Sequence, residues 1–582
     1  MEYVFLTIIM VVSFGIIAWS KAISENPEKK VMFGIATGLL FIFLGLINYN
    51  AMPVLQFWGF EGVWIEAFLV SCLGFWAFFG FAEDSSIEKW WKIKIMPLTV
   101  VLLAFILGCV QSCEVFHADA YNKRLPVTEV NEKTFGKTIA VVEVEKTRAL
   151  DETVANRVGN DVIGNSTALG SRVEPGNPTL QCLTGSFTID NGEKLTFNND
   201  LVYVMPLEHT SIFKWLSYDT TPGYIIVSAS DQNWRRLVTE VNGKKLALRY
   251  LESAYFNDDI ERHIKFNGYL HKGLNDHCFE IDNNGRPYWV LSSYDQKIGF
   301  CGEESEGPIT VDAQTGEIKA YTIKNAPKWI DRIQPKDFIE EQIRQWGEYK
   351  LGWWNSCWFA SQLGVLEPTP GMSLVYSNGR SYWYTGIKSA NKDKGTNGFM
   401  LVDTRTKEAK FYRSPGFNEE EARGIADGQQ WAKSADFKAD FPVLYNVRGV
   451  PTYFMTYKDA TGNIQGYCFL SSINRDAVGC GKLKTEASRK YEEMLKTVGN
   501  DKVKDSEVKP VELTGTVRDI TLEGDVYYVL LNEKSGFEFS GKSKNFPELK
   551  WSKRGDKVKV IFKIGEEKVV PLDSFDIIDF EI

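Results

Sequence analysis

The feature that most constrains the fold of this 582-residue chain is the uneven distribution of its apolar residues. Four apolar runs, at residues 3–19, 31–49, 62–81 and 95–109, fall in the first 115 residues. Each approaches the roughly 20 residues that a helix needs to cross a hydrocarbon core of about 30 Å. The pattern predicts a four-helix transmembrane segment joined to a large region outside the bilayer.

Lysines between the runs predict the orientation. The loops after the first and third runs carry Lys21, Lys29, Lys30, Lys89, Lys92 and Lys94. The loop between the second and third runs has no basic residue. Because short basic loops stay in the cytoplasm, both chain ends are expected outside it. The prediction is a multi-pass protein of the bacterial cytoplasmic (inner) membrane, with the lipid bilayer as a partner and the carboxy-terminal region outside.

Ionisable residues are scarce in the runs, and Glu66 is the only candidate for an ion or proton pathway. Such groups usually mark transport routes, so an anchor or assembly surface is a better prediction than a transporter. The chain has 66 basic and 75 acidic residues, a formal net charge of −9. That balance does not favour a broad nucleic-acid-binding surface.

Six of the nine cysteines follow the apolar region, an even number compatible with up to three disulfides. They are Cys182, Cys278, Cys301, Cys357, Cys468 and Cys480. The favoured pairs are Cys278 with Cys301 and Cys468 with Cys480, because each pair spans an expected hairpin. Six cysteines allow 15 connectivities, so the pairing stays open. No residue spacing matches a common metal site, and no metal or cofactor is expected.

The region after residue 275 contains an internal repeat. The sequence at 285–289 recurs at 379–383, and the sequence at 311–321 recurs at 402–412 with Val, Asp, Thr, Glu, Lys and Tyr at the same offsets. A shorter spacing match links residues 288–301 to residues 467–480. Duplication of one supersecondary unit explains these matches better than chance does.

Each repeat combines turn chemistry with short helices. Asp312 and Asp403 each precede a Thr-Gly or Thr-Lys pair between β-rich runs, which is typical of a tight turn. Helices are expected after caps at Asp151, Asn257 and Asn418, over 336–349 and over 485–498. The alternation of helices with antiparallel strands predicts an α+β class.

Residues 308–318, Pro-Ile-Thr-Val-Asp-Ala-Gln-Thr-Gly-Glu-Ile, resemble the closing hairpin of PepSY-type modules. These are small extracytoplasmic domains made of a helix and a sheet. The resemblance covers about a dozen residues and implies a binding or inhibitory module without catalytic residues. The second copy departs from the pattern at Lys407, where the family has Gly.

Aromatic residues gather between the repeats and predict a binding surface at Trp353, Trp354, Trp358, Tyr382 and Trp383. Large rigid rings provide contact area at low entropic cost. The commoner role of such rings is to fill cores, and that alternative stays open. No catalytic residue is assigned. Cys357 with a distant histidine, or an unrecognised carboxylate pair, would define an alternative, membrane-tethered hydrolase.

The carboxy-terminal stretch has five short predicted strands, at 513–520, 526–531, 537–540, 557–562 and 575–580. Their spacing resembles an OB-type β-barrel, a fold that often binds single-stranded nucleic acid. A nucleic-acid-binding function is therefore a second alternative.

The resulting prediction is a multi-domain protein. Its parts are four transmembrane helices (1–115), an α+β domain (116–275), a PepSY-like repeat (276–365), a second α+β repeat (366–499), a linker (500–510) and an OB-like barrel (511–582). The predicted function is non-enzymatic: an extracytoplasmic binding or scaffold region for envelope-associated assembly. The expected partner is a protein or a second copy of the chain.

Overall fold

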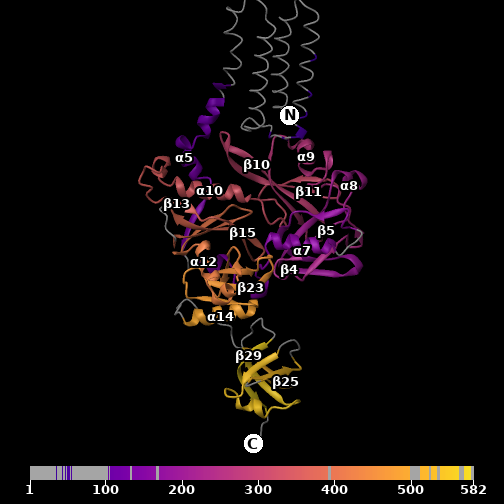
Figure 1. The fold of residues 1–582 in the computed structure, drawn as a ribbon, viewed down its shortest axis with the longest axis vertical. Helices are drawn as coiled ribbons and strands as arrows, with labels where there is room; N and C mark the ends of the chain where they lie inside the picture. The colour runs from indigo at the N-terminus through magenta and orange to yellow at the C-terminus, as the bar shows by residue number, and fades with distance from the viewer. Residues whose placement is uncertain are drawn as a thin grey trace, which may run out of the picture. The chain divides into compact units, whose positions relative to one another are not determined.

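The computed structural model describes isolated positions between residues 35 and 54 and most of the chain from residue 102 onward. In that part it omits residues 104, 132–133, 165–168, 391–394, 498–510, 524–525, 534–537, 563–568 and 579–582. Two compact units are present. The first comprises Met1–Val447 and Pro451–Met494, and the second comprises Arg448–Val450 and Leu495–Ile582 (Figure 1).

The predicted four-helix transmembrane segment requires correction. In the part of the chain that is described, no helix is long and apolar enough to cross a bilayer. Helical residues 105–112 are followed by extended backbone at Cys113, and the next helix, α5 (Glu114–Asn122), carries charged residues such as Glu114 and Asp119. The prediction of a multi-pass protein of the cytoplasmic membrane is overturned with it. The first and third predicted runs, most of the second, residues 95–101 and 104 of the fourth, and all of the predicted linker 500–510 lie outside the described residues.

A five-stranded sheet follows α6 (Phe135–Thr138) and α7 (Glu152–Gly164) in the first unit. Its strands are β2 (Val173–Pro175), β3 (Thr179–Thr188), β4 (Lys194–His209), β5 (Tyr224–Ser228) and β6 (Arg235–Val238). As predicted, Asp151 caps α7, and its carboxylate accepts a hydrogen bond from the backbone N–H of Val154. Val154 and Val158 pack with Tyr203 of β4 in one apolar cluster, so α7 covers one face of this sheet (Figure 1).

The first repeat forms a four-stranded antiparallel sheet. Its strands are β9 (Gly273–Ile281), β10 (Pro287–Ile298), β11 (Cys301–Asp312) and β12 (Ile318–Ala320). The chain reaches it through α8 (Ile212–Ser217), the hairpin β7 (Glu240–Val241) and β8 (Lys244–Lys245), and α9 (Ile260–Ile264). The cap of α9 is Asp259, whose side chain accepts from the Arg262 N–H, so the predicted cap at Asn257 was wrong.

The second repeat forms the centre of a six-stranded sheet. Its strands are β1 (Val127–Asn131), β13 (Leu366–Pro368), β14 (Ser373–Ser377), β15 (Arg380–Ser389), β17 (Gly398–Asp403) and β18 (Ala409–Arg413). Before it lie α10 (Lys336–Glu348) and α11 (Trp353–Ser356). Ile339 and Ile343 of α10 pack on Trp383 of β15, as expected for a helix with one apolar face.

A second five-stranded sheet follows the six-stranded one. Its strands are β20 (Lys438–Ala439), β21 (Val443–Val447), β22 (Val450–Lys458), β23 (Ile464–Ser471) and β24 (Val478–Gly481). It is reached through the pair β16 (Gly395–Thr396) and β19 (Gly416–Phe417) and through α12 (Glu419–Asp427) and α13 (Gln430–Ser434), and α14 (Lys484–Thr497) follows it. Asn418 caps α12, as predicted.

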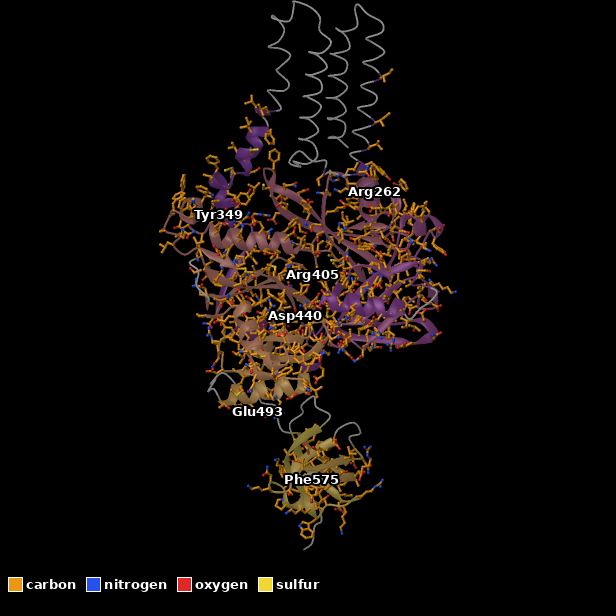
Figure 2. The ribbon with its side chains drawn as sticks, viewed as in Figure 1. Arg262, Tyr349, Arg405, Asp440, Glu493 and Phe575 are labelled. Carbon is orange, nitrogen blue, oxygen red and sulfur yellow. A yellow bond between two sulfur atoms is a disulfide. The ribbon has the colours of Figure 1, made fainter. Side chains whose placement is uncertain are left out.

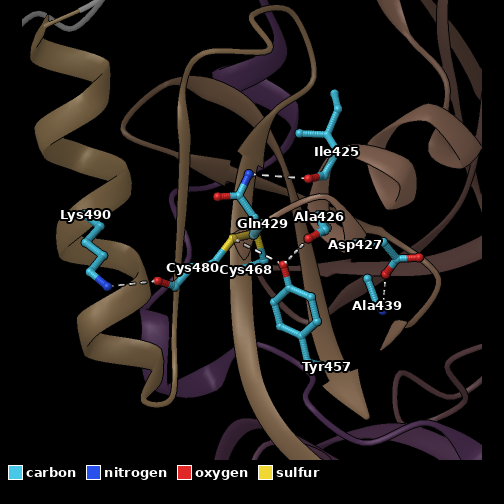
Figure 3. Close-up of a disulfide and its surroundings, with 9 residues drawn as sticks. All are labelled: Ile425, Ala426, Asp427, Gln429, Ala439, Tyr457, Cys468, Cys480 and Lys490. Carbon is cyan, nitrogen blue, oxygen red and sulfur yellow. Dashed lines mark hydrogen bonds between the residues drawn. A yellow bond between two sulfur atoms is a disulfide. The ribbon is translucent and has the colours of Figure 1, made fainter. Parts of the chain in front are cut away.

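A disulfide joins Cys468 of β23 to Cys480 of β24, which face each other across the strand pair (Figure 3). The Tyr457 hydroxyl lies beside it and donates to the Ala426 carbonyl at 2.7 Å. The other favoured pair is not joined, since Cys278 and Cys301 are both free thiols. Cys278 faces Val290 of β10 and Cys301 faces Ile298, so eight residues of extended strand, about 27 Å, separate them.

The second unit contains a closed barrel of five strands. They are β25 (Val511–Glu523), β26 (Val526–Leu531), β27 (Glu538–Lys542), β28 (Lys557–Phe562) and β29 (Val569–Ile577), in the order β25-β26-β27-β29-β28. Val529, Phe539 and Val560 alternate with outward-facing residues and fill its core. The short 3₁₀ helix η7 (Pro547–Lys550) places Leu549 in the same core.

Candidate functional site

The structure divides the predicted aromatic surface into two sets. Trp353, Trp354 and Trp358 lie in or beside α11, in the connection between α10 and β13. Trp354 is 67% exposed and Trp358 is 87% exposed. Tyr382 and Trp383 lie on β15 instead. Only the first set therefore offers an exposed aromatic surface.

Trp383 is a core residue, so its assignment to a binding surface is corrected. Its ring is buried with Met400 and Phe411, and its indole N–H donates to the Gln334 carbonyl at 2.9 Å. Tyr382 is half-buried opposite Asp403. The alternation of side chains along β15 turns Trp383 toward α10 and fills the core, which is the commoner role of aromatic residues.

We define the aromatic loop as residues 351–363. Besides the two tryptophans it exposes three large apolar side chains: Leu351, Phe359 and Leu363. Trp358 and Phe359 meet edge to face, with ring centroids 5.6 Å apart. Five exposed apolar side chains within 13 residues make the aromatic loop a candidate interaction surface.

Asn355 holds the aromatic loop closed. Its side-chain amide donates to the Leu363 carbonyl at 3.0 Å, and its side-chain oxygen accepts from the Leu363 N–H at 3.1 Å. Gly352 enters the loop with φ of 83°, a conformation that favours glycine, and its N–H donates to the Tyr349 carbonyl. The exposed rings are therefore displayed on a short closed loop.

Trp353 anchors the aromatic loop to α5 and to the end of α10. It packs against Ala118, Tyr121 and Tyr349, a small buried cluster that joins α5 to the end of α10. Its ring also meets Trp354 edge to face at 5.0 Å. One tryptophan of the predicted set thus supports the loop, and the two exposed ones are free to contact a partner.

A charged network lies at the base of the loop. Arg344 of α10 donates to Glu341, Glu348 and Glu114, so it ties α10 to α5. The hydroxyl of Tyr349, which is labelled in Figure 2, donates to Glu114 at 2.6 Å. Burial, and then the bond to Glu114, raises the pKa of Tyr349, and burial raises the pKa of Glu348. The network fixes the support on which the aromatic loop is displayed.

Cys357 was the nucleophile of the alternative hydrolase. Its thiol lies 3.5 Å from the Trp353 carbonyl, and no histidine among the described residues hydrogen-bonds to it. A reactive cysteine needs a base or a positive environment that lowers its pKa. In the described residues, no group of three or more His, Cys, Asp or Glu side chains could hold a metal ion.

Three residues of the surface were missed by sequence reasoning: Leu351, Phe359 and Leu363. A signal was present, because these residues flank the tryptophans without helical or strand periodicity. Arg344 and Glu114 were also missed. They lie 230 positions apart, so no local pattern joins them.

No known protein family model matches this chain, and no curated protein matches it. Among solved structures, a crystal structure of an ACO/RPE65 chimera is similar at 10% identity. The alignment covers 67% of this chain and 59% of the chimera, so the chain spans less than two thirds of that protein. The TM-score of 0.12 is too low to carry an argument about fold. These comparisons give no support to the resemblances to PepSY modules and OB barrels.

Proposed function

We propose that this chain is a non-enzymatic binding or scaffold protein whose contact surface is the aromatic loop, residues 351–363. The observation that carries the proposal is the outward display of Trp354, Trp358 and Phe359 on an anchored support. Tryptophan is enriched among the residues that dominate binding energy at interfaces.

The expected partner is the apolar surface of another protein. Protein interfaces combine an apolar centre rich in aromatic residues with a polar rim in which arginine is frequent. The aromatic loop with Arg344, Glu341 and Glu348 at its base has this composition. Because Asn355 closes the aromatic loop and Trp353 anchors it, the loop would lose little conformational entropy on binding.

The test is photo-crosslinking in the native cell, with a benzophenone amino acid in place of Phe359. We expect a specific protein adduct, which mass spectrometry would identify. A double variant, Trp354→Ser with Trp358→Ser, should weaken binding of that protein at least about tenfold, a loss of about 1.4 kcal/mol or more.

Trp551→Ser is the matched control, since Trp551 is 64% exposed and lies in the other unit. An adduct between two copies of the chain would identify self-association as the binding event. Absence of any protein adduct, or a partner bound equally well by the double variant, would contradict the proposed function.

A further inference from the structure

A cavity of about 260 Å³ with both polar and apolar walls lies beside β4, away from the aromatic loop. Its walls come from η3 (Val144–Lys146), from β4, and from the turn between β5 and β6. They include one ammonium group, two carboxylates, three hydroxyls and an indole. These belong to Lys146, Asp200, Asp231, Thr196, Ser228, Ser230 and Trp234.

A β-bulge shapes this cavity. Thr184 of β3 faces Asn198 of β4, and Leu183 faces Asp200, so Asn199 is the extra residue. Asn199 has φ of 53°, an uncommon conformation for a residue other than glycine. Bulges re-aim side chains and are frequent next to functional sites. Here the bulge places Asp200 in the wall of the cavity.

The polar groups of the cavity are held in place by the protein. Asp200 accepts from the Asn198 N–H at 2.8 Å, and its other oxygen lies 3.8 Å from the Lys146 ammonium. Lys146 also donates to the Asn198 carbonyl at 3.3 Å. The Trp234 ring meets Phe197 edge to face at 5.9 Å. Donors, acceptors and an aromatic surface are thus fixed around one space.

A second cavity, of about 240 Å³, adjoins the first and shares Lys146 and Leu201 with it. Side-chain amides of Asn198, Asn199 and Asn378 contribute to its lining. Because Lys146 and Leu201 line both spaces, we call the two together the groove. Because each space is below the roughly 300 Å³ of a drug-sized pocket, a ligand with small repeating units would fit better than one compact molecule.

We propose that this groove binds a neutral saccharide chain, with one sugar ring in each cavity. Sugar hydroxyls both donate and accept hydrogen bonds, which matches the mixture of carboxylate, hydroxyl, amide and ammonium groups. The Trp234 ring, which has the Arg236 guanidinium 5.4 Å from its centroid, lines the first cavity and offers an aromatic wall to a sugar ring. The carboxylates of Glu143, Asp200 and Asp231 outnumber the Lys146 ammonium in the lining of the groove and repel acidic sugars and phosphates.

An extended peptide is the competing ligand, and the sheet disfavours it. Peptides that bind as added strands need a free strand edge. Along the groove β4 is paired with β3, and β5 joins it only at Val202–Pro206. Before Val202 the Asn198 carbonyl accepts from Lys146, and the bulge at Asn199 interrupts the regular spacing that an added strand would need. The saccharide site is separate from the aromatic loop and extends the proposed function to a second ligand.

The test uses the full chain and isothermal titration with chitotetraose, cellotetraose, maltotetraose and tetragalacturonate. We expect at least one neutral tetrasaccharide to bind with a Kd below about 1 mM, and the acidic one to bind at least about tenfold more weakly. Trp234→Ala should weaken binding about tenfold or more, and Asp200→Asn by a factor of about five.

Asp200→Asn keeps an oxygen that can accept from Asn198, so it tests the site without disrupting the bulge. Trp354→Ser, in the aromatic loop, should leave saccharide binding unchanged, which separates this site from the proposed function. Failure of all three neutral probes at about 10 mM would overturn the proposal. The proposal would also be overturned if Trp234→Ala and Asp200→Asn both bound the saccharide as tightly as the unmodified chain does. Binding of extended peptides alone would overturn it as well.

Discussion

The two repeats of the first unit have the same internal contacts but different external ones. In the first, Tyr288 of β10 faces Asp312 of β11, and in the second, Tyr382 of β15 faces Asp403 of β17. Each aspartate accepts two backbone hydrogen bonds at 2.8–3.0 Å from the turn that follows it. An arginine pairs with each one as well, Arg286 in the first repeat and Arg380 in the second. The turn and its local contacts are therefore the same in both copies of the repeat.

The repeats diverge where they meet each other. Gly316 of the first turn corresponds to Lys407 of the second, and both have φ near 70°. Lys407 pairs with Glu304 of the first repeat. Arg405, which is labelled in Figure 2, donates to carbonyls of Ala326, Pro327 and Ile330 in the segment between the repeats. The second copy therefore has Lys407 in place of glycine at the left-handed turn position, and this lysine forms a contact that holds the two repeats together.

The largest expected effect tests the shared part of the turns. Asp312→Ala and Asp403→Ala should each lower the free energy of unfolding by about 3 kcal/mol, because each leaves two turn N–H groups and an arginine unpaired. Urea titration followed by tryptophan fluorescence would measure both. A loss below about 1 kcal/mol in one copy, with the full loss in the other, would show that the two turns are not equivalent.

The turns could be predicted from the sequence because their contacts are local. The strands at 526–531 and 557–562 were predicted for a similar reason, since alternation of side chains is visible within one strand. Burial of Trp383 could not be predicted, because it depends on which helix covers the sheet. The groove depends on the bulge at Asn199, which exists only relative to the partner strand.

Exchange of the divergent residues tests the difference between the copies. Gly316→Lys should cost about 2–3 kcal/mol, because a Cβ there would lie 2.4 Å from the Tyr250 ring. Lys407→Gly should cost only about 1 kcal/mol, since glycine relieves the backbone strain while the pair with Glu304 is lost.

Lys407→Ala separates these two contributions. It loses the ion pair and keeps the strain, so it should be about 1 kcal/mol less stable than Lys407→Gly in the same urea titration. Equal stability of the two variants would show that the left-handed conformation is not costly at this position.

The pH dependence of stability tests the contacts that Asp331 makes with both repeats. Asp331 receives hydrogen bonds on its carbonyl from Ser381 and Thr404 of the second repeat, and its N–H donates to Glu280 of the first. Burial raises the pKa of Asp331 to about 7 and also raises that of Glu280. The unfolded chain loses these protons near pH 4, so the folded chain binds more protons between about pH 4 and pH 7. This pair should therefore destabilise the fold as the pH rises through that range.

We expect a decrease of about 1 kcal/mol per pH unit, measured by urea titration between about pH 5 and pH 7. Asp331→Asn keeps an acceptor for the Cys182 N–H and cannot titrate, so it should flatten the slope. A slope that is unchanged in this variant would remove Asp331 as its source.

The smallest expected effect concerns the two arginines. Arg286 and Arg380 are about half exposed, so water screens their pairs with the buried aspartates. Arg286→Lys and Arg380→Lys should each cost about 0.5–1 kcal/mol, because lysine keeps the charge but loses the planar fork of donors. Double-mutant cycles with Asp312→Asn and Asp403→Asn would measure the two couplings. Since the turn geometry is shared, the couplings should agree within about 0.5 kcal/mol. A larger difference would mean that contacts between the repeats extend into the turns themselves.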